Sequence, residues 1–322
     1  MRVIGFSDFG GPDVLRVMEW PDPHAGPGEV RVRVHAAAVN PADTLLRSGV
    51  NAQVLAGVPG PYVPGMDIAG VIDELGPDTE TGLTVGDAVM AMVIPVGQAA
   101  GGYAEHVVLP AGWVVPAPVG LDHVAAATLP MNGLTALLAF DQLALAPGSV
   151  LAVIGAAGAV GGYLVQLGKH AGLTVVADAA PADEALVRDL GATDVVPRDG
   201  ATANAAARIR ELYPDGVDAL ADAALGGPGL LDAVRDGGTY ARFRDEKLPG
   251  GHTSNDGGRV TVLTPFVPDY AGRTDKLRQI RDLAEQDVLT PRVAATLPAA
   301  AAAEAHRRLE AGGVRGRIVL TF

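Results

Sequence analysis

A glycine-rich turn between an apolar run and a helix-like run is the feature that most constrains the fold of this sequence. Residues 150–172 read VLAVIGAAGAVGGYLVQLGKHAG, with no charged residue before Lys169. A charge-free run of about 20 residues is long enough for a membrane-spanning helix. Pro147 and Gly148 interrupt the run on one side and glycines interrupt it on the other, so we expect a strand-turn-helix unit of a soluble protein instead.

The composition is that of a globular protein long enough for two domains. Of its 322 residues, 48% are hydrophobic and 19% are charged, and Gly and Pro are dispersed among apolar runs. The formal net charge of −13 repels phosphate backbones and anionic lipid surfaces, so we expect no nucleic-acid and no membrane partner. Asp8 would interrupt the apolar core of a secretion leader, and we therefore expect a cytoplasmic protein.

The absence of cysteine excludes thiolate zinc sites, disulfides and cysteine nucleophiles. The seven histidines are scattered, and no pair has the spacing of metal ligands within one element. We therefore assign no metal site and no catalytic histidine.

Segment patterns divide the chain into a β-rich part and an alternating part. Over roughly the first hundred residues, short β-branched runs alternate with Gly, Pro and Asp, which favours an all-β unit. From Leu121 onward, an Ala- and Leu-rich helix is followed by alternating strand-like and helix-like runs, as in a doubly wound parallel sheet. The chain closes with a helix, a glycine stop and a strand, for which the β-rich part is an available partner. The predicted fold class is α/β, with a Rossmann-type parallel sheet and a β-rich second domain.

The turn at residues 155–161 matches a dinucleotide-binding pattern. Read against G-x-G-x-x-G, Ala156 occupies the first glycine position, with Gly158 and Gly161 in the second and third. These glycines would let the backbone approach a pyrophosphate and let the helix pack closely on the strand, and the helix N-terminus would supply N–H groups. Tight packing alone is the alternative, but the strand-turn-helix context favours a cofactor. The candidate cofactor-binding residues of the turn are Gly155, Ala156, Ala157, Gly158, Ala159, Val160 and Gly161.

Two further residues bear on the choice of cofactor. Asp178 lies at the end of the second strand, where a carboxylate would bind ribose hydroxyls and disfavour a 2′-phosphate, which favours NADH. A turn or helix-capping role for Asp178 is an equal alternative. Arg198 follows the next strand-like run and could bind a 2′-phosphate, which would favour NADPH.

Ordered motifs along nearly the whole chain resemble the zinc-independent quinone oxidoreductase branch, which is zeta-crystallin-like, of the medium-chain dehydrogenase/reductase superfamily. They are AAAVNPADTLLRSG, VPGMDIAGVIDELG, VGDAVMAM, GGYAEHVVLP, LPMNGLTALLAF, GAAGAVGGYLVQLGKHAG, LGATDVV and RLEAGGVRGRIVLTF. The resemblance implies a GroES-like catalytic domain at 1–121, a Rossmann domain at 122–269 and a C-terminal segment at 270–322 that returns to the catalytic domain. The active cleft would lie where the domains meet. A homodimer would form through the edge strand RVTVLT.

Zinc-dependent members of this superfamily carry ligands that are missing here. They have a Cys in the segment corresponding to residues 40–44, a His-Glu pair in the segment corresponding to Met66-Asp67, and a cysteine-rich lobe. This chain has no Cys, so neither zinc site can be built. The resemblance therefore implies hydride transfer from a reduced nicotinamide to a quinone or an α,β-unsaturated carbonyl, while the protein supplies orientation and a dry pocket.

By the same resemblance, Asn40 and Asp43 lie at the substrate cleft, where Asn40 would hydrogen-bond near the cofactor or the acceptor carbonyl. The local alternative is a Pro turn with an N-cap Asp that opens a helix. Tyr62 and Tyr103 could donate a proton or line the pocket, although aromatic residues in such positions more often serve packing. We take Asn40, Asp43 and Tyr62 as the candidate catalytic residues.

Other family positions extend the candidate cofactor site. For the two residues on the Ala-rich helix, the alternative is a position in a buried core helix, where a hydroxyl bonds to its own backbone. For the two arginines, the alternative is a solvated position on the surface. These candidates are Asn132, Thr135, Thr264, Pro265, Arg315 and Arg317.

The sequence leaves the cofactor and the reaction partly open. The family favours NADPH, but the region after the second strand is acidic until Arg188, so NADH stays an alternative. An enoyl-thioester reductase is the rival enzyme, although it would need a basic anchor for a carrier phosphate. A non-catalytic NADPH-binding redox sensor or structural protein is the rival of another class, since fold alone does not establish turnover.

Overall fold

The computed structural model describes residues 1–95, 101–198, 203–243, 252–256 and 258–322. These residues form two compact units, each with its own sheet. Unit 1 comprises residues 1–131, 271–286 and 291–322, and unit 2 comprises residues 132–270 and 287–290.

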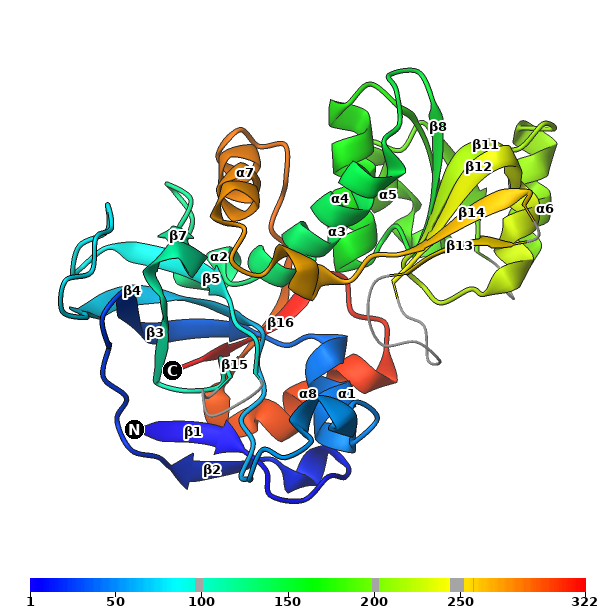
Figure 1. The fold of residues 1–322 in the computed structure, drawn as a ribbon. Coiled ribbons are helices and arrows are strands. Elements are labelled where there is room, and N and C mark those ends of the chain that lie inside the picture. Colours follow the sequence, from blue (N-terminus) through cyan, green and yellow to red (C-terminus); the bar gives the residue numbers. More distant parts are fainter. Residues whose placement is uncertain (96–100, 199–202, 244–251, 257) are drawn as a thin grey trace. The chain divides into compact units, whose positions relative to one another are not determined.

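Unit 1 is built on a mainly antiparallel seven-stranded sheet, in the order β15, β16, β3, β4, β5 and β7, with β6 also paired to β3. The terminal strand β16 pairs antiparallel with β3, which confirms the predicted return of the C-terminus to the β-rich unit (Figure 1). A separate two-stranded sheet joins β1 to β2. The strands are β1 Arg2–Gly5, β2 Arg16–Glu19, β3 Glu29–Ala38, β4 Asp67–Leu75, β5 Ala88–Met92, β6 His106–Pro110, β7 Val114–Pro116, β15 Val293–Pro298 and β16 Arg317–Thr321.

The core of unit 1 follows from alternation along β3. In EVRVRVHAAA the valines at 30, 32 and 34 are buried while the arginines between them are less so, as expected for a strand with one face on a core. The helices of this unit are α1 Pro41–Ser48, α2 His123–Ala126, α7 Thr274–Glu285 and α8 Ala302–Ala311. Helix α1 begins after Asn40 and ends at Gly49, whose φ of 87° is the left-handed conformation that glycine adopts at little cost.

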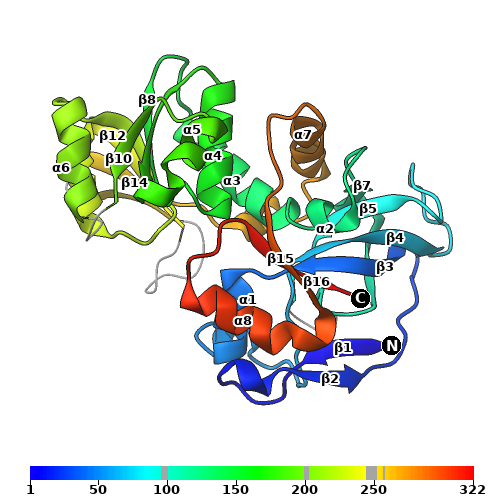
Figure 2. The same ribbon diagram turned by 180° about the vertical axis from the view of Figure 1, so that it is seen from behind.

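Unit 2 is a doubly wound sheet. Its strand order is β10, β9, β8, β11, β12, β14 and β13, and all neighbours are parallel except β13 and β14. Figures 1 and 2 show α4 and α5 on one face of this sheet and α6 on the other. The elements are α3 Pro130–Leu143, β8 Val150–Ile154, α4 Ala159–His170, β9 Thr174–Ala179, α5 Glu184–Leu190, β10 Asp194–Pro197, α6 Ala203–Leu212, β11 Val217–Asp222, β12 Val234–Arg242, β13 His252–Asp256 and β14 Val260–Thr264.

One sequence expectation about this sheet is wrong. The family resemblance implies that RVTVLT, which contains β14, is the edge strand through which two copies pair. In the structure β13 pairs with β14 on that side, so β14 has a neighbour on both sides among the described residues. The homodimer stays a prediction.

The glycine-rich stretch at residues 150–172 forms β8, a turn and α4. Among the described residues, one stretch, His123–Leu143, is long and apolar enough to cross a membrane by length and composition, and 67% of its 18-residue apolar window is buried inside the structure. Burial of that extent is what a core helix of a globular protein shows.

Candidate functional site

Asn40 holds the junction between β3 and α1, and it is fully buried. Its backbone N–H donates to Asp43 Oδ2 at 2.8 Å, because Asp43 is the third residue of the helix and its side chain reaches back to the cap. The sequence alternative of Asp43 as an N-cap is therefore wrong in position: Asn40 is the cap and Asp43 supports it.

Asp67 accepts a hydrogen bond from the side chain of Asn40. It is the first residue of β4 and is fully buried. Asn40 Nδ2 donates to Asp67 Oδ2 at 2.7 Å, and the backbone N–H of Met131 donates to Asp67 Oδ1 at 2.5 Å. Two buried carboxylates thus hold Asn40, one by its backbone and one by its carboxamide (the Asn40 clamp, formed by Asp43 and Asp67).

Behind Asp43 lies a second buried pair. Tyr103 Oη donates to Asp43 Oδ2 at 3.2 Å, and the same Oη lies 3.2 Å from His306 Nε2. Gly65 N–H donates to the other oxygen, Asp43 Oδ1, at 3.0 Å. Tyr103 and His306 are both fully buried, so Tyr103, which the sequence weighed mainly as packing, is a polar member of this group.

Burial sets the protonation behaviour of the clamp. Loss of solvation raises the pKa of Asp43 to about 6 and the pKa of Asp67 to about 7, while the hydrogen bonds and the nearby charge of Arg317 act in the opposite direction. Burial and the charge of Arg47 lower the pKa of His306 to about 3. At neutral pH the histidine is therefore uncharged, and the two acids titrate within reach of physiological pH.

The other candidates in unit 1 divide into two groups. Arg317 is buried, begins β16 and contributes its positive charge to the clamp carboxylates. Tyr62 lies apart from the clamp in an aromatic group, because its ring stacks on Phe9 at 5.8 Å and its hydroxyl donates to the carbonyl of Val58 at 3.0 Å. Those contacts agree with the packing alternative for Tyr62.

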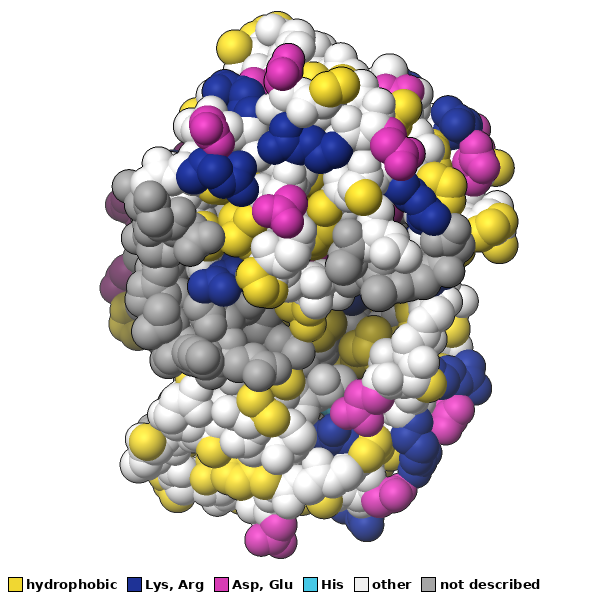
Figure 3. All heavy atoms as spheres, turned by 90° about the vertical axis from the view of Figure 1, so that its right-hand side faces the viewer, with side chains coloured by type: hydrophobic (Ala, Val, Ile, Leu, Met, Phe, Trp, Pro, Cys, Tyr) yellow, Lys and Arg dark blue, Asp and Glu magenta, His cyan; other side chains and the backbone are white. Residues whose placement is uncertain are grey.

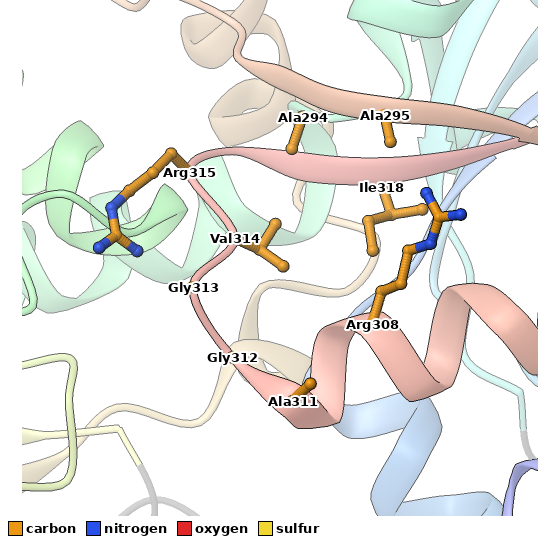
Figure 4. Close-up of a pocket in the computed structure, with 9 residues that line it drawn as sticks. All are labelled: Ala294, Ala295, Arg308, Ala311, Gly312, Gly313, Val314, Arg315 and Ile318. Atoms are coloured by element: carbon orange, nitrogen blue, oxygen red, sulfur yellow. The ribbon is translucent and has the colours of Figure 1, made fainter.

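Arg315 lines a pocket of about 540 Å³ at the surface of unit 1. Figure 4 shows its guanidinium directed away from that of Arg308, which donates to Glu304 at 2.8 Å. The two basic groups therefore do not converge on one anion site. The pocket is lined by Ala294, Ala295, Arg308, Ala311, Gly312, Gly313, Val314, Arg315 and Ile318.

The glycine turn in unit 2 has the geometry of a phosphate cradle. Gly155 has a φ of 83° and makes the tight turn, so Gly155, and not Ala156 as the sequence pattern predicts, performs the role of the first glycine. A Cβ at Gly161 would lie 2.2 Å from the carbonyl oxygen of Gly155, so only glycine lets α4 begin this close to β8. A Cβ at Gly158 would meet only that oxygen, at 3.1 Å, which leaves the backbone approachable from the other side. The turn fits a dinucleotide.

Asp178 is tied to this turn. It lies within β9 and is buried, which excludes the sequence alternative of a turn or capping residue. Its Oδ1 accepts from the N–H groups of Gly155 at 2.6 Å and Ala156 at 3.3 Å. Its Oδ2 accepts from Arg198 Nε at 2.7 Å, and the Arg198 side chain is 36% exposed. Asp178 and Arg198 therefore form one ion pair in the structure, although the sequence analysis took Asp178 as an indication of NADH and Arg198 as an indication of NADPH.

The remaining cofactor candidates are buried in unit 2. Asn132 and Thr135 lie on α3, and Thr264 ends β14 and precedes Pro265. Arg242 Nε donates to Thr264 Oγ1 at 3.5 Å. Their roles toward a cofactor stay predictions.

Sequence reasoning missed Asp67, Tyr103 and His306 as a group. The signal for Asp67 was its place in the segment where zinc-dependent relatives carry ligands. Histidines also meet at a second place, where the rings of His35 and His123 lie 4.5 Å apart. Within the described ranges, no group of three or more His, Asp or Glu side chains is arranged to hold a metal ion.

Basic and acidic side chains are interspersed on the face drawn in Figure 3, and hydrophobic side chains lie among them. The expectation that nucleic acid is not a partner stays a prediction.

Comparison with known proteins gives full-length matches. Residues 26–119 match the alcohol dehydrogenase GroES-like domain, and residues 190–320 match a model described as zinc-binding dehydrogenase. A 2-haloacrylate reductase of Burkholderia sp is 30% identical over 97% of this chain and 96% of its own length. A quinone oxidoreductase of Pseudomonas aeruginosa is 29% identical, covering 98% of both chains.

Solved structures extend these matches to the whole fold. A mycobacterial protein complexed with NADPH is 29% identical, with a TM-score of 0.84 and full coverage of both chains. An alcohol dehydrogenase superfamily protein of Novosphingobium aromaticivorans is 25% identical, with a TM-score of 0.86 and the same coverage.

Proposed function

Because the chain belongs to the quinone oxidoreductase branch of the medium-chain dehydrogenase/reductase superfamily, we propose that it is a zinc-independent reductase. In this proposal, hydride passes from NADPH to a quinone or to an α,β-unsaturated carbonyl compound. Membership of this family makes the chain an oxidoreductase that uses a nicotinamide cofactor. The acceptor, the preference for NADPH and the independence from zinc are the parts proposed.

The observation that carries the proposal is the pairing of Asn40 with Asp67. Their hydrogen bond of 2.7 Å occupies the segments in which zinc-dependent relatives hold their metal. A carboxamide that donates its N–H groups offers no ligand nitrogen, and thiolate is excluded because the chain has no cysteine. The donor set therefore does not fit a catalytic zinc ion, and we derive no step through one.

The nicotinamide group supplies the hydride when it is bound, and the chain's own residues have three tasks. The turn of Gly155, Gly158 and Gly161 receives the pyrophosphate at the N-terminus of α4. Asn40 forms part of the wall that orients the acceptor, and the Asn40 clamp keeps that wall in one place. The buried surroundings of the clamp keep water from competing for these hydrogen bonds.

The preference for NADPH rests on Arg198. Its guanidinium is partly exposed and is oriented by Asp178, and a planar guanidinium suits the 2′-phosphate. Asp178 uses both of its oxygens on the turn and on Arg198, so a ribose hydroxyl would have to compete for it. The NADPH complex of the mycobacterial relative supports the same choice.

Two relatives suggest the acceptor. One is named a quinone oxidoreductase and one a 2-haloacrylate reductase. Quinones and 2-haloacrylates both contain a carbon-carbon double bond conjugated to a carbonyl or carboxyl group, which accepts hydride at carbon. We place this chain among reductases of such conjugated acceptors, and we propose that it works as a cytoplasmic homodimer.

The test is a titration of the purified protein with NADPH and NADH separately, followed by nicotinamide fluorescence, and then addition of 1,4-benzoquinone or 2-chloroacrylate. The proposal expects tighter binding of NADPH and acceptor-dependent loss of reduced cofactor, with no loss of rate after dialysis against EDTA. Binding without turnover on either acceptor would favour a non-catalytic protein. Failure to bind either cofactor would contradict the assignment of the turn at residues 155–161 as a dinucleotide-binding site.

A further inference from the structure

The loop that follows β11, residues 223–227, lies against the glycine turn of the candidate dinucleotide site. β11 and β8 are parallel neighbours, with Asp222 opposite Ile154, so the loop and the turn leave the sheet at the same edge. The N–H of Ala223 donates to the carbonyl of Ile154 at 2.9 Å. A Cβ at Gly155 would lie 3.0 Å from the carbonyl carbon of Ala223. The loop is therefore packed on the residue that makes the tight turn.

Leu225, in this loop, combines a strained backbone with an exposed apolar side chain. Its φ of 57° lies in the left-handed region, which is unfavourable for a residue with a Cβ. The side chain is 50% exposed, so half of its apolar surface stays in contact with water. Strained residues persist where their surroundings hold them, and they cluster at ligand sites.

Asp222 holds Leu225 in this conformation from both sides. Its carboxylate is buried at the end of β11. Oδ1 accepts from the N–H of Ala224 at 3.1 Å and from the N–H of Gly226 at 3.0 Å, and these two residues flank Leu225. Oδ2 accepts from the N–H of Gly227 at 3.2 Å. Three N–H groups of one short loop thus converge on one carboxylate, which fixes the path of the loop.

Tyr240 fixes the carboxylate itself. It lies on the neighbouring strand β12 and is buried, and its hydroxyl donates to Asp222 Oδ2 at 2.8 Å. A carboxylate can accept all of these hydrogen bonds, whereas an amide in its place would turn an NH₂ group against donors. The arrangement therefore requires an acid at position 222.

We propose that Asp222 is a positioning residue that presents the Leu225 side chain as an apolar wall of the dinucleotide site. The inference deepens the proposed function and rests on it, because it requires a nicotinamide dinucleotide at the glycine turn. Doubly wound sheets bind ligands outside the carboxyl ends of their strands, at the point where the strand order reverses. In the order β10, β9, β8, β11, β12, that point lies between β8 and β11.

The chemistry of this wall is apolar contact. The Leu225 side chain covers a flat ring of the bound cofactor, and both surfaces are removed from water. A leucine carries no charge and does not distinguish a 2′-phosphate from a hydroxyl, so the wall contributes equally to the binding of NADPH and of NADH.

The first test is a fluorescence titration of L225A and L225G with NADPH and with NADH. Both variants remove the apolar side chain, and glycine also adopts the left-handed backbone at little cost. We expect each variant to bind both cofactors about five- to tenfold more weakly than the native protein. L212A is the matched control, because Leu212 is also 50% exposed but ends α6, before the chain enters β11 at Val217. It should bind both cofactors with native affinity.

The second test asks whether Asp222 acts through Leu225. D222A removes the acceptor of the loop N–H groups and should weaken NADPH binding about tenfold. In the double variant D222A/L225A, the second substitution should add less than about twofold, because the displaced side chain no longer contacts the cofactor. D222N keeps one oxygen for the N–H groups of Ala224 and Gly226, so it should bind NADPH more tightly than D222A.

Native affinity in both L225A and L225G would overturn the inference. Independent losses that multiply in D222A/L225A would also contradict it, because Asp222 would then serve the fold alone. If D222A does not fold, Y240F takes its place in the same comparison, since it removes one donor from Asp222 and leaves the loop N–H groups their acceptor. Its loss of affinity should be smaller and should disappear in the L225A background, and a loss that persists there contradicts the inference. A native protein that binds neither cofactor would instead reject the dinucleotide site on which the proposed function rests.

Discussion

The hydroxyl of Tyr103 lies 3.2 Å from Nε2 of His306, although 203 residues separate them in the chain. Tyr103 has one hydroxyl hydrogen, which it donates to Asp43, so His306 Nε2 must be the donor in the second contact. The neutral ring then carries its proton on Nε2. This chain of buried groups links α8 to the N-terminal turn of α1.

The buried acids predict an unusual pH dependence of stability. The folded pKa values of Asp43 and Asp67 are raised to about 6 and about 7, above the unfolded value of about 3.9, so the folded state binds protons that the unfolded state releases. His306 has the opposite sign, because its folded pKa of about 3 lies below the unfolded value of about 6.5. The sum predicts that unit 1 gains about 2 kcal/mol between about pH 8 and about pH 5.

Urea unfolding followed by tryptophan fluorescence measures this change in the right unit, because both tryptophans, Trp20 and Trp113, belong to unit 1. The Asp67→Asn variant serves as the control, since it removes the largest contribution and leaves a nearly flat profile. Native stability that decreases steadily from about pH 8 to about pH 5 would contradict the prediction.

His306→Gln gives a second prediction from the same cluster. The new amide can still donate to Tyr103, but it does not take up a proton in the unfolded state. The loss of stability that His306 causes toward acid pH therefore disappears. We expect the gain between about pH 8 and about pH 5 to increase to about 4 kcal/mol, even though the variant is less stable overall. The readout is the difference between the two pH values by urea unfolding, and an unchanged difference would show that His306 does not titrate as its burial implies.

Much of the architecture could be predicted because it depends on local pattern. The cradle combines an apolar strand, glycines at fixed spacing and a helix start within residues 150–172, and each of these signals is local. The partner of β16 was also predictable, since a short terminal strand needs a neighbour and the β-rich unit offered one. Local pattern also misleads: the run GLLDAVRD at residues 229–236 is helix-like in composition, but the chain forms a short 3-10 turn at Pro228–Ala233 and then enters β12.

The candidate site was less predictable because its contacts are long-range. Asp178 satisfies N–H groups of the turn 22 and 23 residues away, and a sequence pattern does not distinguish such a support from a ribose ligand. The polar role of Tyr103 depends on Asp43 and His306, which arrive from two other elements. Burial of a histidine is not readable from its neighbours in the chain, so His306 gave no signal.

Gly161→Ala should abolish cofactor binding. The new Cβ would lie 2.2 Å from the carbonyl oxygen of Gly155, a backbone atom that cannot move without opening the turn, and overpacking of this kind costs about 1–3 kcal/mol. Gly158→Ala is the milder comparison, because its Cβ would meet that oxygen at 3.1 Å. Fluorescence titration with NADPH should rank the native protein above Gly158→Ala and Gly158→Ala above Gly161→Ala.

Gly82→Ala is the matched control for these variants, because its Cβ would meet nothing within 4 Å. It should bind NADPH as the native protein does. Native affinity in Gly161→Ala, with circular dichroism showing an intact fold, would mean that the turn is not the cradle.

Arg198→Ala should change the choice of cofactor more than the stability of the fold. The guanidinium is partly exposed and its ion pair with Asp178 lies at the edge of the sheet formed by β9 and β10, so its removal takes a cation from the region of the 2′-phosphate while Asp178 keeps its bonds to the turn. The freed Oδ2 of Asp178 then becomes available to a ribose hydroxyl. We expect NADPH to bind about tenfold more weakly and NADH to bind at least as tightly as before.

Arg188→Ala, which removes a cation paired with Glu184 on α5, is the control and should leave both affinities unchanged. Equal weakening of both cofactors in Arg198→Ala would instead assign Arg198 a structural role in holding Asp178.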